Sequence, residues 1–232
     1  MNAQKLSKRL ETVAKFVPQD AIVADIGSDH AYLPCYLVHN NIAKSAIAGE
    51  VVKGPYDSAC HEVQKEKLTN KITVRLADGL AAIEPGDGVT AITIAGMGGP
   101  LITSILEKHP LALEGVERLI LQPNIHAKVI REWALQNCWK IIDEVILLED
   151  EKIYEILVLE RGEMNLSELE KLLGPVLKQQ HSDVFHTKWT REVEQWGHVR
   201  EALQKAEQTP EILAKSAELA HLIEEVGEVL KR

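Results

Sequence analysis

Cysteine is scarce in this 232-residue sequence, which contains only Cys35, Cys60 and Cys138. The number is odd, the three positions are far apart, and no two of them form a Cys-x-x-Cys pair. A disulfide framework needs an even set of cysteines, and a structural zinc site needs closely spaced ligand pairs. The sequence therefore predicts reduced thiols and no metal site.

Long apolar runs are also missing. None approaches the length of about 20 residues that a membrane-spanning helix needs, and the first residues lack a signal-peptide pattern. The composition, 45% hydrophobic and 26% charged, is ordinary for a globular protein. We expect one well-filled α/β domain with a smaller appendage, located in the cytoplasm and away from membranes.

An excess of positive charge is the third absence. The net charge is −9, from 26 Lys and Arg against 35 Asp and Glu. The overall field therefore cannot attract a nucleic acid, and any such binding needs a local basic patch. Two candidate patches exist, Lys5, Lys8 and Arg9 near the first residues, and Lys188 and Arg191 in the last third.

A glycine-rich dinucleotide fingerprint is incomplete. The apolar run 21–26 ends in a turn where the three glycine positions of G-x-G-x-x-G hold Gly27, Asp29 and Tyr32. The second glycine normally lets a pyrophosphate approach the backbone, and a carboxylate at Asp29 would repel that phosphate. A nucleoside cofactor that carries positive charges and no phosphate fits instead, and S-adenosylmethionine has these properties. The turn therefore predicts a methyl-donor site.

The rest of the first two thirds alternates between strand and helix patterns. This alternation, which ends in a β-hairpin, predicts an α/β fold with a seven-stranded, mostly parallel sheet and an antiparallel edge. The expected strands are 21–26, 45–49, 72–77, 89–95, 118–121, 140–148 and 154–160. The expected helices are 4–17, 30–39, 54–67, one that begins at Pro100, and 125–137.

The last third has a different character. Ser167 and Glu170 have the spacing of a capping box. Trp189, Val193, Trp196 and Leu203 recur at helical spacing, as do Leu219, Ile223, Val226 and Leu230 after Pro210. We therefore expect a catalytic domain over 1–161 and a C-terminal α-helical coiled-coil hairpin over 162–232.

Ligand sites in such sheets lie at the carboxyl ends of the strands. Glu50, at the end of the second strand, is placed to accept hydrogen bonds from a ribose diol, and Asp78 with Gly79 would lie beside the adenine. Asp25 is a candidate to hold the turn or the ammonium group of the cofactor. The complete predicted cofactor set is Asp25, Gly27, Ser28, Asp29, His30, Glu50, Val51, Asp78, Gly79, Ala95, Gly96, Met97 and Gly98.

Three residues are the candidates for catalysis. Asp29 is placed to bind the methionine end of the cofactor or the amine of a target base, and Tyr32 to stack on that base. Met97 belongs to a glycine-rich segment whose bare backbone beside the methyl group would let a flat base approach closely. His30 is more typical of a neutral helix-start histidine than of a general base. The segment 94–99 replaces the Asn/Asp-Pro-Pro-Tyr motif of enzymes that methylate exocyclic amines, which favours another acceptor atom.

Several stretches are together specific to one family. They are Asp25-Ile-Gly-Ser-Asp-His-Ala-Tyr-Leu-Pro34, Ala48-Gly-Glu-Val-Val-Lys-Gly-Pro-Tyr56, Ile94-Ala-Gly-Met-Gly-Gly99, Leu121-Gln-Pro-Asn124 and Tyr154-Glu-Ile-Leu-Val158. In this order they resemble the bacterial TrmK family, which methylates N1 of adenosine 22 in tRNA. The resemblance is close over residues 5–160. The C-terminal helical hairpin resembles the coiled-coil domain of the family in type.

The resemblance implies a class I (Rossmann-like) methyltransferase that uses S-adenosylmethionine and acts on tRNA. N1 of adenine has a lone pair and no proton, so the reaction needs mainly positioning and electrostatic stabilisation. The expected tRNA contacts are Lys5, Lys8, Arg9, Gln122, Asn124, Lys188 and Arg191. We expect a monomer that needs no metal ion.

Other functions remain open at this point. The same cofactor site would serve a methyltransferase for another RNA position or for a small molecule. A nicotinamide-dependent oxidoreductase is disfavoured by the glycine pattern. A non-catalytic RNA-binding module that retains the fold is a further alternative.

Overall fold

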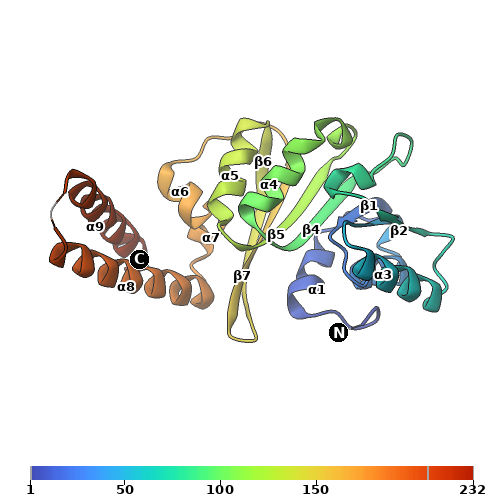
Figure 1. Cartoon of the computed structure of the whole chain (residues 1–232), viewed down its shortest axis with the longest axis horizontal. Helices are drawn as coiled ribbons and strands as arrows, with labels where there is room; N and C mark the ends of the chain where they lie inside the picture. Colours follow the sequence, from blue (N-terminus) through green and yellow to red (C-terminus); the bar gives the residue numbers. More distant parts are fainter. Residues whose placement is uncertain (1, 208, 232) are drawn as a thin grey trace. The chain divides into compact units, whose positions relative to one another are not determined.

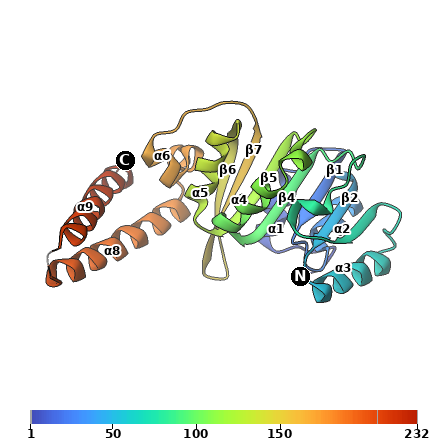
Figure 2. The same cartoon turned by 45° about the horizontal axis from the view of Figure 1, so that its top comes forward.

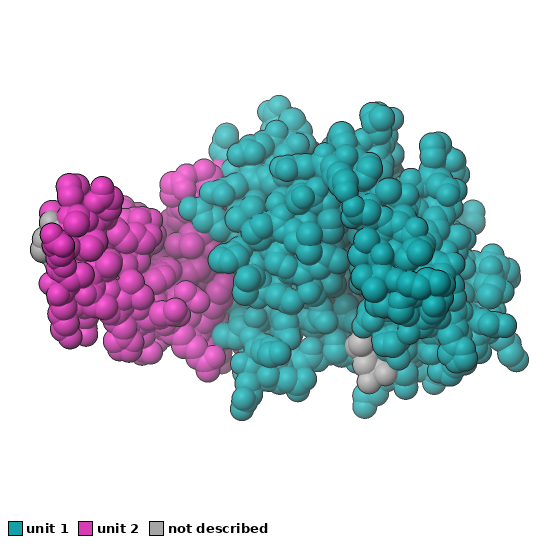
Figure 3. Space-filling view, in the orientation of Figure 1, with its two compact units in different colours: residues 1–165 teal, residues 166–232 magenta. Residues whose placement is uncertain are grey.

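The computed structural model describes residues 2–207 and 209–231. Its contacts divide the chain into two compact units, Met1–Asn165 and Leu166–Arg232 (Figure 3). The sequence analysis predicted this boundary four residues earlier, between 161 and 162.

The first unit contains a seven-stranded sheet of order β3-β2-β1-β4-β5-β7-β6 (Figure 1). Strands β1 to β5 pair in parallel, whereas β7 is antiparallel to both β5 and β6. The predicted mostly parallel sheet with an antiparallel edge is confirmed. The strands are β1 Ala21–Ile26, β2 Ala43–Glu50, β3 Ile72–Leu76, β4 Ala91–Gly98, β5 Arg118–Ile125, β6 Trp139–Glu149 and β7 Lys152–Arg161.

Helices cover both faces of this sheet (Figure 2). Buried side chains of α1, α2 and α3 form one hydrophobic cluster with alternate strand residues such as Val23 and Ile120. Their strand neighbours point to the other face, where α4 contacts β4 and β5 and α5 contacts β6. These helices are α1 Lys8–Lys15, α2 Tyr32–His39, α3 Lys53–Lys65, α4 Gly99–Lys108 and α5 Ala127–Gln136.

The first helix is shorter than its apolar spacing suggested. Helix α1 begins at Lys8, not at residue 4, because Ser7 is its N-cap and accepts a hydrogen bond from the Leu10 N–H. Leu6 and Val17, which flank α1, are nevertheless buried. The apolar pattern therefore identified buried residues correctly but gave wrong helix ends.

Strands β4 and β5 are longer than expected. The sequence predicted that they stop at residues 95 and 121, but they remain paired as far as Gly98 and Ile125. Gly96 and Asn124 are each skipped in this pairing, so one bulge on each strand compensates for the other. The glycine-rich segment after Ala95 is therefore part of a bulged strand, not a bare loop.

The connection between β3 and β4 is short. It contains the 3₁₀ turn η1 Gly79–Ala82, and a second such turn, η2 Pro110–Leu113, follows α4. A parallel crossover usually carries a longer α-helix.

The second unit consists of helices. The capping box predicted at Ser167 is present at the start of α6 Glu168–Leu173. Gly174, with φ +89°, and Pro175 then end α6 and begin α7 Pro175–Gln180. The long helices α8 Asp183–Lys205 and α9 Pro210–Leu230 lie side by side as a hairpin (Figure 1), with Trp189, Leu219 and Val226 buried.

Candidate active site

The turn after β1 is tightly constrained. The N–H groups of Gly27 and Ser28 both donate to the Gly49 carbonyl on β2, at 2.9 and 3.3 Å. Gly27 has φ +72°, and a Cβ atom added there would lie 2.2 Å from Cε of Met97. Glycine suits this turn because a side chain is strained at this positive φ, and one here would also displace the end of the Met97 side chain.

Asp25, near the end of β1, holds this turn through its side chain. It is buried, and its carboxylate accepts hydrogen bonds from the hydroxyls of Ser28 and Thr93, both at 2.6 Å. Thr93 lies directly opposite Asp25 on β4. Burial raises the pKa of Asp25, and the two hydrogen bonds oppose that shift only in part.

Glu50 brings a second buried carboxylate to the same edge. It ends β2, and its Oε1 accepts a hydrogen bond from the Asp29 N–H. Burial is the main reason why the pKa of Glu50 is raised, and repulsion by Asp25 and Asp29 adds to it. Asp25, Asp29 and Glu50 thus surround the Gly27 turn with negative charge that suits a cation and repels a phosphate.

The bulged ends of β4 and β5 form the opposite wall. Gln122 is fully buried, and its Oε1 accepts hydrogen bonds from the Gly96 N–H at 3.0 Å and from the Arg9 guanidinium. Nδ2 of Asn124 donates to the Gly96 carbonyl at 2.8 Å. The backbone N–H and the carbonyl of Gly96 are therefore both hydrogen-bonded to side chains of β5.

A cavity of about 260 Å³ lies between these two walls. Seven of the predicted site residues line it, namely Arg9, Asp25, Ser28, Asp29, Tyr32, Ala95 and Gly96. Leu10 and Leu33 also line it, and sequence reasoning missed both because it treated them as ordinary buried positions of helices. The structure thus brings together residues from α1, α2 and the ends of β1 and β4.

Asp29 and Tyr32 line this cavity, and His30, which does not, contacts both of them. Asp29 has φ +56°, and its side chain is exposed. The rings of His30 and Tyr32 are stacked with centroids 5.1 Å apart, and Nε2 of His30 is 3.7 Å from Asp29 Oδ1. A planar ligand at the mouth would thus meet an aromatic face and a carboxylate.

Other predicted cofactor residues lie at the same edge but do not line the cavity. Val51, next to Glu50, is 63% exposed. Asp78 is exposed and paired with Lys108, and this ion pair lowers the pKa of Asp78. Gly79 follows it in η1, whereas Met97 covers the Gly27 turn and Gly98 precedes α4.

The predicted tRNA contacts separate into three groups. Lys5 and Lys8 are exposed at the start of the chain. Gln122 is buried, and its amide is engaged inside the protein, so direct contact with tRNA does not suit it. Lys188 lies over the Trp189 ring at 4.5 Å and Arg191 is exposed, both on α8 in the second unit.

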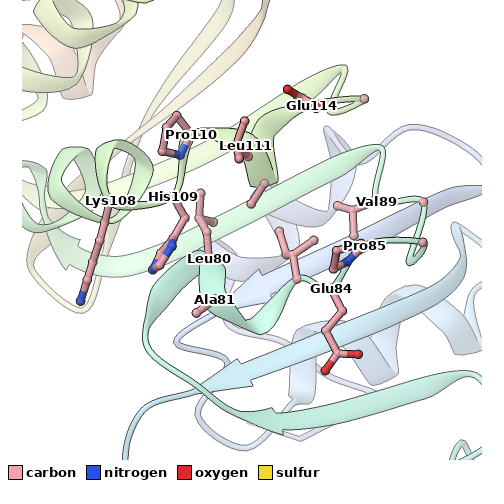
Figure 4. A pocket seen from close by; sticks show the side chains of 15 residues that line it. Leu80, Ala81, Glu84, Pro85, Val89, Lys108, His109, Pro110, Leu111 and Glu114 are labelled. Carbon is pink, nitrogen blue, oxygen red and sulfur yellow. The ribbon is translucent and has the colours of Figure 1, made fainter.

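A larger hollow of about 850 Å³ lies elsewhere in the first unit (Figure 4). Segments 80–89 and 108–115 line it, mostly with apolar side chains such as Leu80, Val89 and Leu111 and with the charged side chains of Glu84, Lys108 and Glu114. It lies between the β3–β4 connection and the segment after α4, and none of the predicted site residues lines it.

Two further properties concern the described part of the chain. Residues 2–207 and 209–231 contain no cluster of three or more His, Cys, Asp or Glu side chains that would hold a metal ion. Within these residues, no helix is long and apolar enough to cross a membrane.

Comparison with known proteins gives a consistent result. The family model "TrmK: tRNA (adenine(22)-N(1))-methyltransferase" matches residues 23–228. The tRNA (adenine(22)-N(1))-methyltransferase of Bacillus subtilis (strain 168) is 49% identical over 236 residues, which cover 99% of both proteins.

Solved structures agree with this match. The crystal structure of B. subtilis TrmK has a TM-score of 0.93 at 48% identity, covering 98% of this chain and 99% of that one. A Streptococcus pneumoniae protein in complex with S-adenosyl-L-methionine has a TM-score of 0.89 at 48% identity, covering 97% of this chain and 100% of that one. In sequence and in fold, therefore, this chain belongs to the TrmK family of tRNA (adenine(22)-N(1))-methyltransferases.

Proposed function

We propose that this chain transfers a methyl group from S-adenosylmethionine to N1 of the adenosine at position 22 of tRNA, at the cavity between the Gly27 turn and Gly96. The observation that carries this proposal is the set of three carboxylates, Asp25, Asp29 and Glu50, around the turn. A cationic sulfonium nucleoside is attracted to this set, whereas a dinucleotide pyrophosphate is repelled.

The residues at the turn fit the cofactor in chemistry. Glu50 would accept the ribose hydroxyls, Asp78 the adenine amine, and the exposed Val51 would cover one face of the adenine. Asp25 and Ser28 would hold the ammonium end. When bound, S-adenosylmethionine supplies an electrophilic methyl group and a neutral leaving group, so the protein needs no acid for this step.

The acceptor side of the cavity suits a flat base. Tyr32 offers a stacking face, and Gly96 has no side chain that would keep the base at a distance. Asp29 would accept the N6 amine and stabilise the positive charge that develops on the adenine ring. Because N1 carries no proton, no residue has to act as a general base.

Folded tRNA would not present this base directly. A stacked or paired adenine has to leave its stack to reach the cavity, which costs a few kcal/mol. Contacts with phosphates elsewhere repay that cost, and Lys5, Lys8, Lys188 and Arg191 are the proposed sources. Asn124, which is exposed beside Gly96, would contact the nucleotide nearer the base.

We propose that the enzyme acts as a monomer. The reaction needs no Lewis acid, because the nucleophile has a free lone pair and the leaving group is neutral. We infer accordingly that the enzyme uses no metal and acts in the cytoplasm, where its tRNA substrate is found.

A methylation assay tests the proposed activity. Unmodified tRNA with adenosine at position 22 should accept one methyl group, which should map to N1 of that nucleotide. The same tRNA with guanosine 22 should not react, nor should a mixture of small metabolites. Modification of another nucleotide or of a metabolite would overturn the assignment, and donor binding without any transfer would indicate a binding module.

Asp29 provides the sharpest test of the residue roles. Asp29→Asn should lower kcat by about 10²-fold or more, because the charge that stabilises the cationic ring is lost. The dissociation constant for S-adenosylmethionine, measured by calorimetry, should change by only a few fold. Asp57→Asn, at an exposed position of α3, is the matched control and should leave both quantities unchanged.

The opposite outcome would be equally informative. If Asp29→Asn weakens donor binding as much as it lowers kcat, then Asp29 acts on the cofactor and not on the adenine. In that case the proposed stabilisation of the product ring by Asp29 is wrong.

A further inference from the structure

Arg9 differs from the two lysines with which it was grouped. Lys5 and Lys8 are exposed, as expected of residues that bind phosphates, but Arg9 is half-buried and lines the cavity. The three residues have similar charge and lie within five positions of one another. Their different surroundings therefore indicate different roles.

The position of Arg9 is fixed at its backbone and at its side chain. The N–H groups of Lys8 and Arg9, at the start of α1, donate to the Glu149 carboxylate at the end of β6. The guanidinium lies over the Tyr154 ring, 5.3 Å from its centroid, and Nη1 donates to Oε1 of Gln122. Such a planar, multiply held guanidinium is a rigid donor and differs from a mobile lysine.

Gln122 connects Arg9 to Gly96 in the cavity wall. Its Oε1 accepts from both Arg9 and the Gly96 N–H, and its Nε2 donates to the Pro123 carbonyl at 2.8 Å. The side chain has no exposed surface. Because each end of the amide is occupied, its orientation is set, and with it the position of the Gly96 peptide.

Gly96 is the residue whose position matters most for an incoming base. It has φ +82°, lies at the bulge of β4, and lines the cavity opposite Asp29. A Cβ atom added to it would lie 3.5 Å from Nη1 of Arg9, so the guanidinium lies close to this glycine. A shift of Arg9 would reach Gly96 through Gln122, whose Oε1 accepts hydrogen bonds from both residues.

We propose that Arg9 is a positioning residue of the methyl transfer, which holds the Gly96 wall against the acceptor base through Gln122, and that it is not an electrostatic anchor for tRNA. This inference rests on the function proposed above. It requires a planar guanidinium at Arg9, not merely a positive charge. A phosphate that drew Arg9 outward would break its contacts with Gln122 and Tyr154.

Arg9→Lys separates the two roles, because it keeps the charge and loses the planar donor. We expect kcat at saturating tRNA to fall by about 10²-fold, since small misplacements of reacting groups cost this much. The KM for tRNA, the salt dependence of kcat/KM and the donor dissociation constant should remain within two-fold of wild type.

Lys8→Ala is the matched contrast on the neighbouring residue. It should leave kcat unchanged, raise the KM for tRNA, and reduce the slope of log kcat/KM against log salt by about 0.9 per lost phosphate contact. In Arg9→Ala, guanidinium ion at constant ionic strength should restore part of the lost kcat, whereas ammonium ion should not.

Asn124→Ala tests the connection to Gly96 independently. Asn124 is exposed, so the variant should fold, and thermal melting will verify this for each variant. Its loss of kcat should be less than multiplicative with that of Arg9→Lys, because both side chains act on the same residue, Gly96.

The proposal is wrong if Arg9→Lys keeps the wild-type kcat, or if Arg9→Gln shows the same change in KM and salt slope as Lys8→Ala. Either result is meaningful only when the wild-type enzyme methylates position 22. Inactivity of the wild type would instead contradict the proposed function.

Discussion

Single carboxylates determine how the cofactor site responds to pH. Asp25 and Glu50 are buried at the edge of the sheet, and both pKa values are raised. A carboxyl whose pKa is higher in the folded than in the unfolded state favours folding at low pH, and this contribution is lost as the pH rises through the folded pKa. A bound cation offsets that loss, because it favours the ionised form.

Donor affinity should therefore depend on Glu50 and on pH. As the pH falls from about 8 toward the raised pKa of Glu50, S-adenosylmethionine should bind more weakly, because the carboxylate becomes protonated. Glu50→Gln should weaken binding at neutral pH by roughly 10- to 100-fold, the range expected for losing charged hydrogen bonds. Calorimetric titrations across this pH range provide the measurement.

The control for this prediction is Glu107→Gln, at an exposed position of α4. It should follow the wild-type pH dependence, whereas Glu50→Gln should show a flatter one. An equally steep pH dependence in Glu50→Gln would mean that another group titrates, and Asp25 would be the next residue to test.

The sequence predicted the roles of residues that lie at the ends of strands. Asp25, Glu50 and Asp78 each follow an apolar run, so the architecture alone places them at one edge. Gln122 could not be interpreted in this way. The sequence suggested that its strand stops at Leu121, and only the pairing of β4 with β5 shows that Gln122 lies within the strand and is buried.

At the scale of elements, β6, β7 and α5 are joined by buried charges. Nε of Arg131 on α5 donates to Glu144 of β6 at 2.7 Å, and Nη2 donates to Glu155 of β7 at 2.6 Å. Arg131 and Glu144 have no exposed surface, and Glu155 is 4% exposed. Removing one partner of such a group leaves the remaining charges buried and uncompensated.

Arg131→Met should therefore lower the free energy of unfolding by about 3–5 kcal/mol. Chemical denaturation monitored by circular dichroism gives this value directly. The triple replacement of Arg131, Glu144 and Glu155 by apolar residues should recover much of the loss. A single variant as stable as wild type would show that this buried group contributes little.

Element boundaries were the least predictable part of the fold. Apolar periodicity gave the number and order of the strands, because each buried strand has its own run. It placed the start of α1 too early, since the capping by Ser7 and the contact with Glu149 are not part of that pattern. The 3₁₀ turns η1 and η2 were missed because four residues are too few to show a period.

At the scale of the whole molecule, the negative net charge makes local basic residues important. The chain carries a net charge of −9, so its overall field repels tRNA. Binding must then depend on a few local cations. Lys188 and Arg191 on α8 are the candidates in the second unit.

The double variant Lys188→Ala and Arg191→Ala should raise the KM for tRNA several-fold at physiological salt. Its slope of log kcat/KM against log salt should decrease by about 0.9 for each phosphate contact that is lost. Donor affinity and kcat at saturating tRNA should not change, because neither residue belongs to the cavity lining.

Lys215→Ala serves as the comparison, since Lys215 is an exposed cation on α9 that pairs with Glu218. It should have no effect on the KM for tRNA. Equal effects of both variants would indicate a diffuse response to net charge, and no effect of the double variant would remove α8 from the tRNA-binding surface.

The two bulges at the end of β4 and β5 have a consequence for how this edge tolerates change. Gly96 and Asn124 are the two residues omitted from the pairing, and Asn124 donates a hydrogen bond to Gly96. Deletion of either residue alone would shift the pairing register of the strand ends by one residue. Met97 or Ile125 would then point to the opposite face of the sheet. Loss of both would restore a regular ladder and abolish the recess for the base. The fold therefore tolerates an insertion or deletion here only when both strands change together. Even such a paired change removes the recess and with it the methyl transfer.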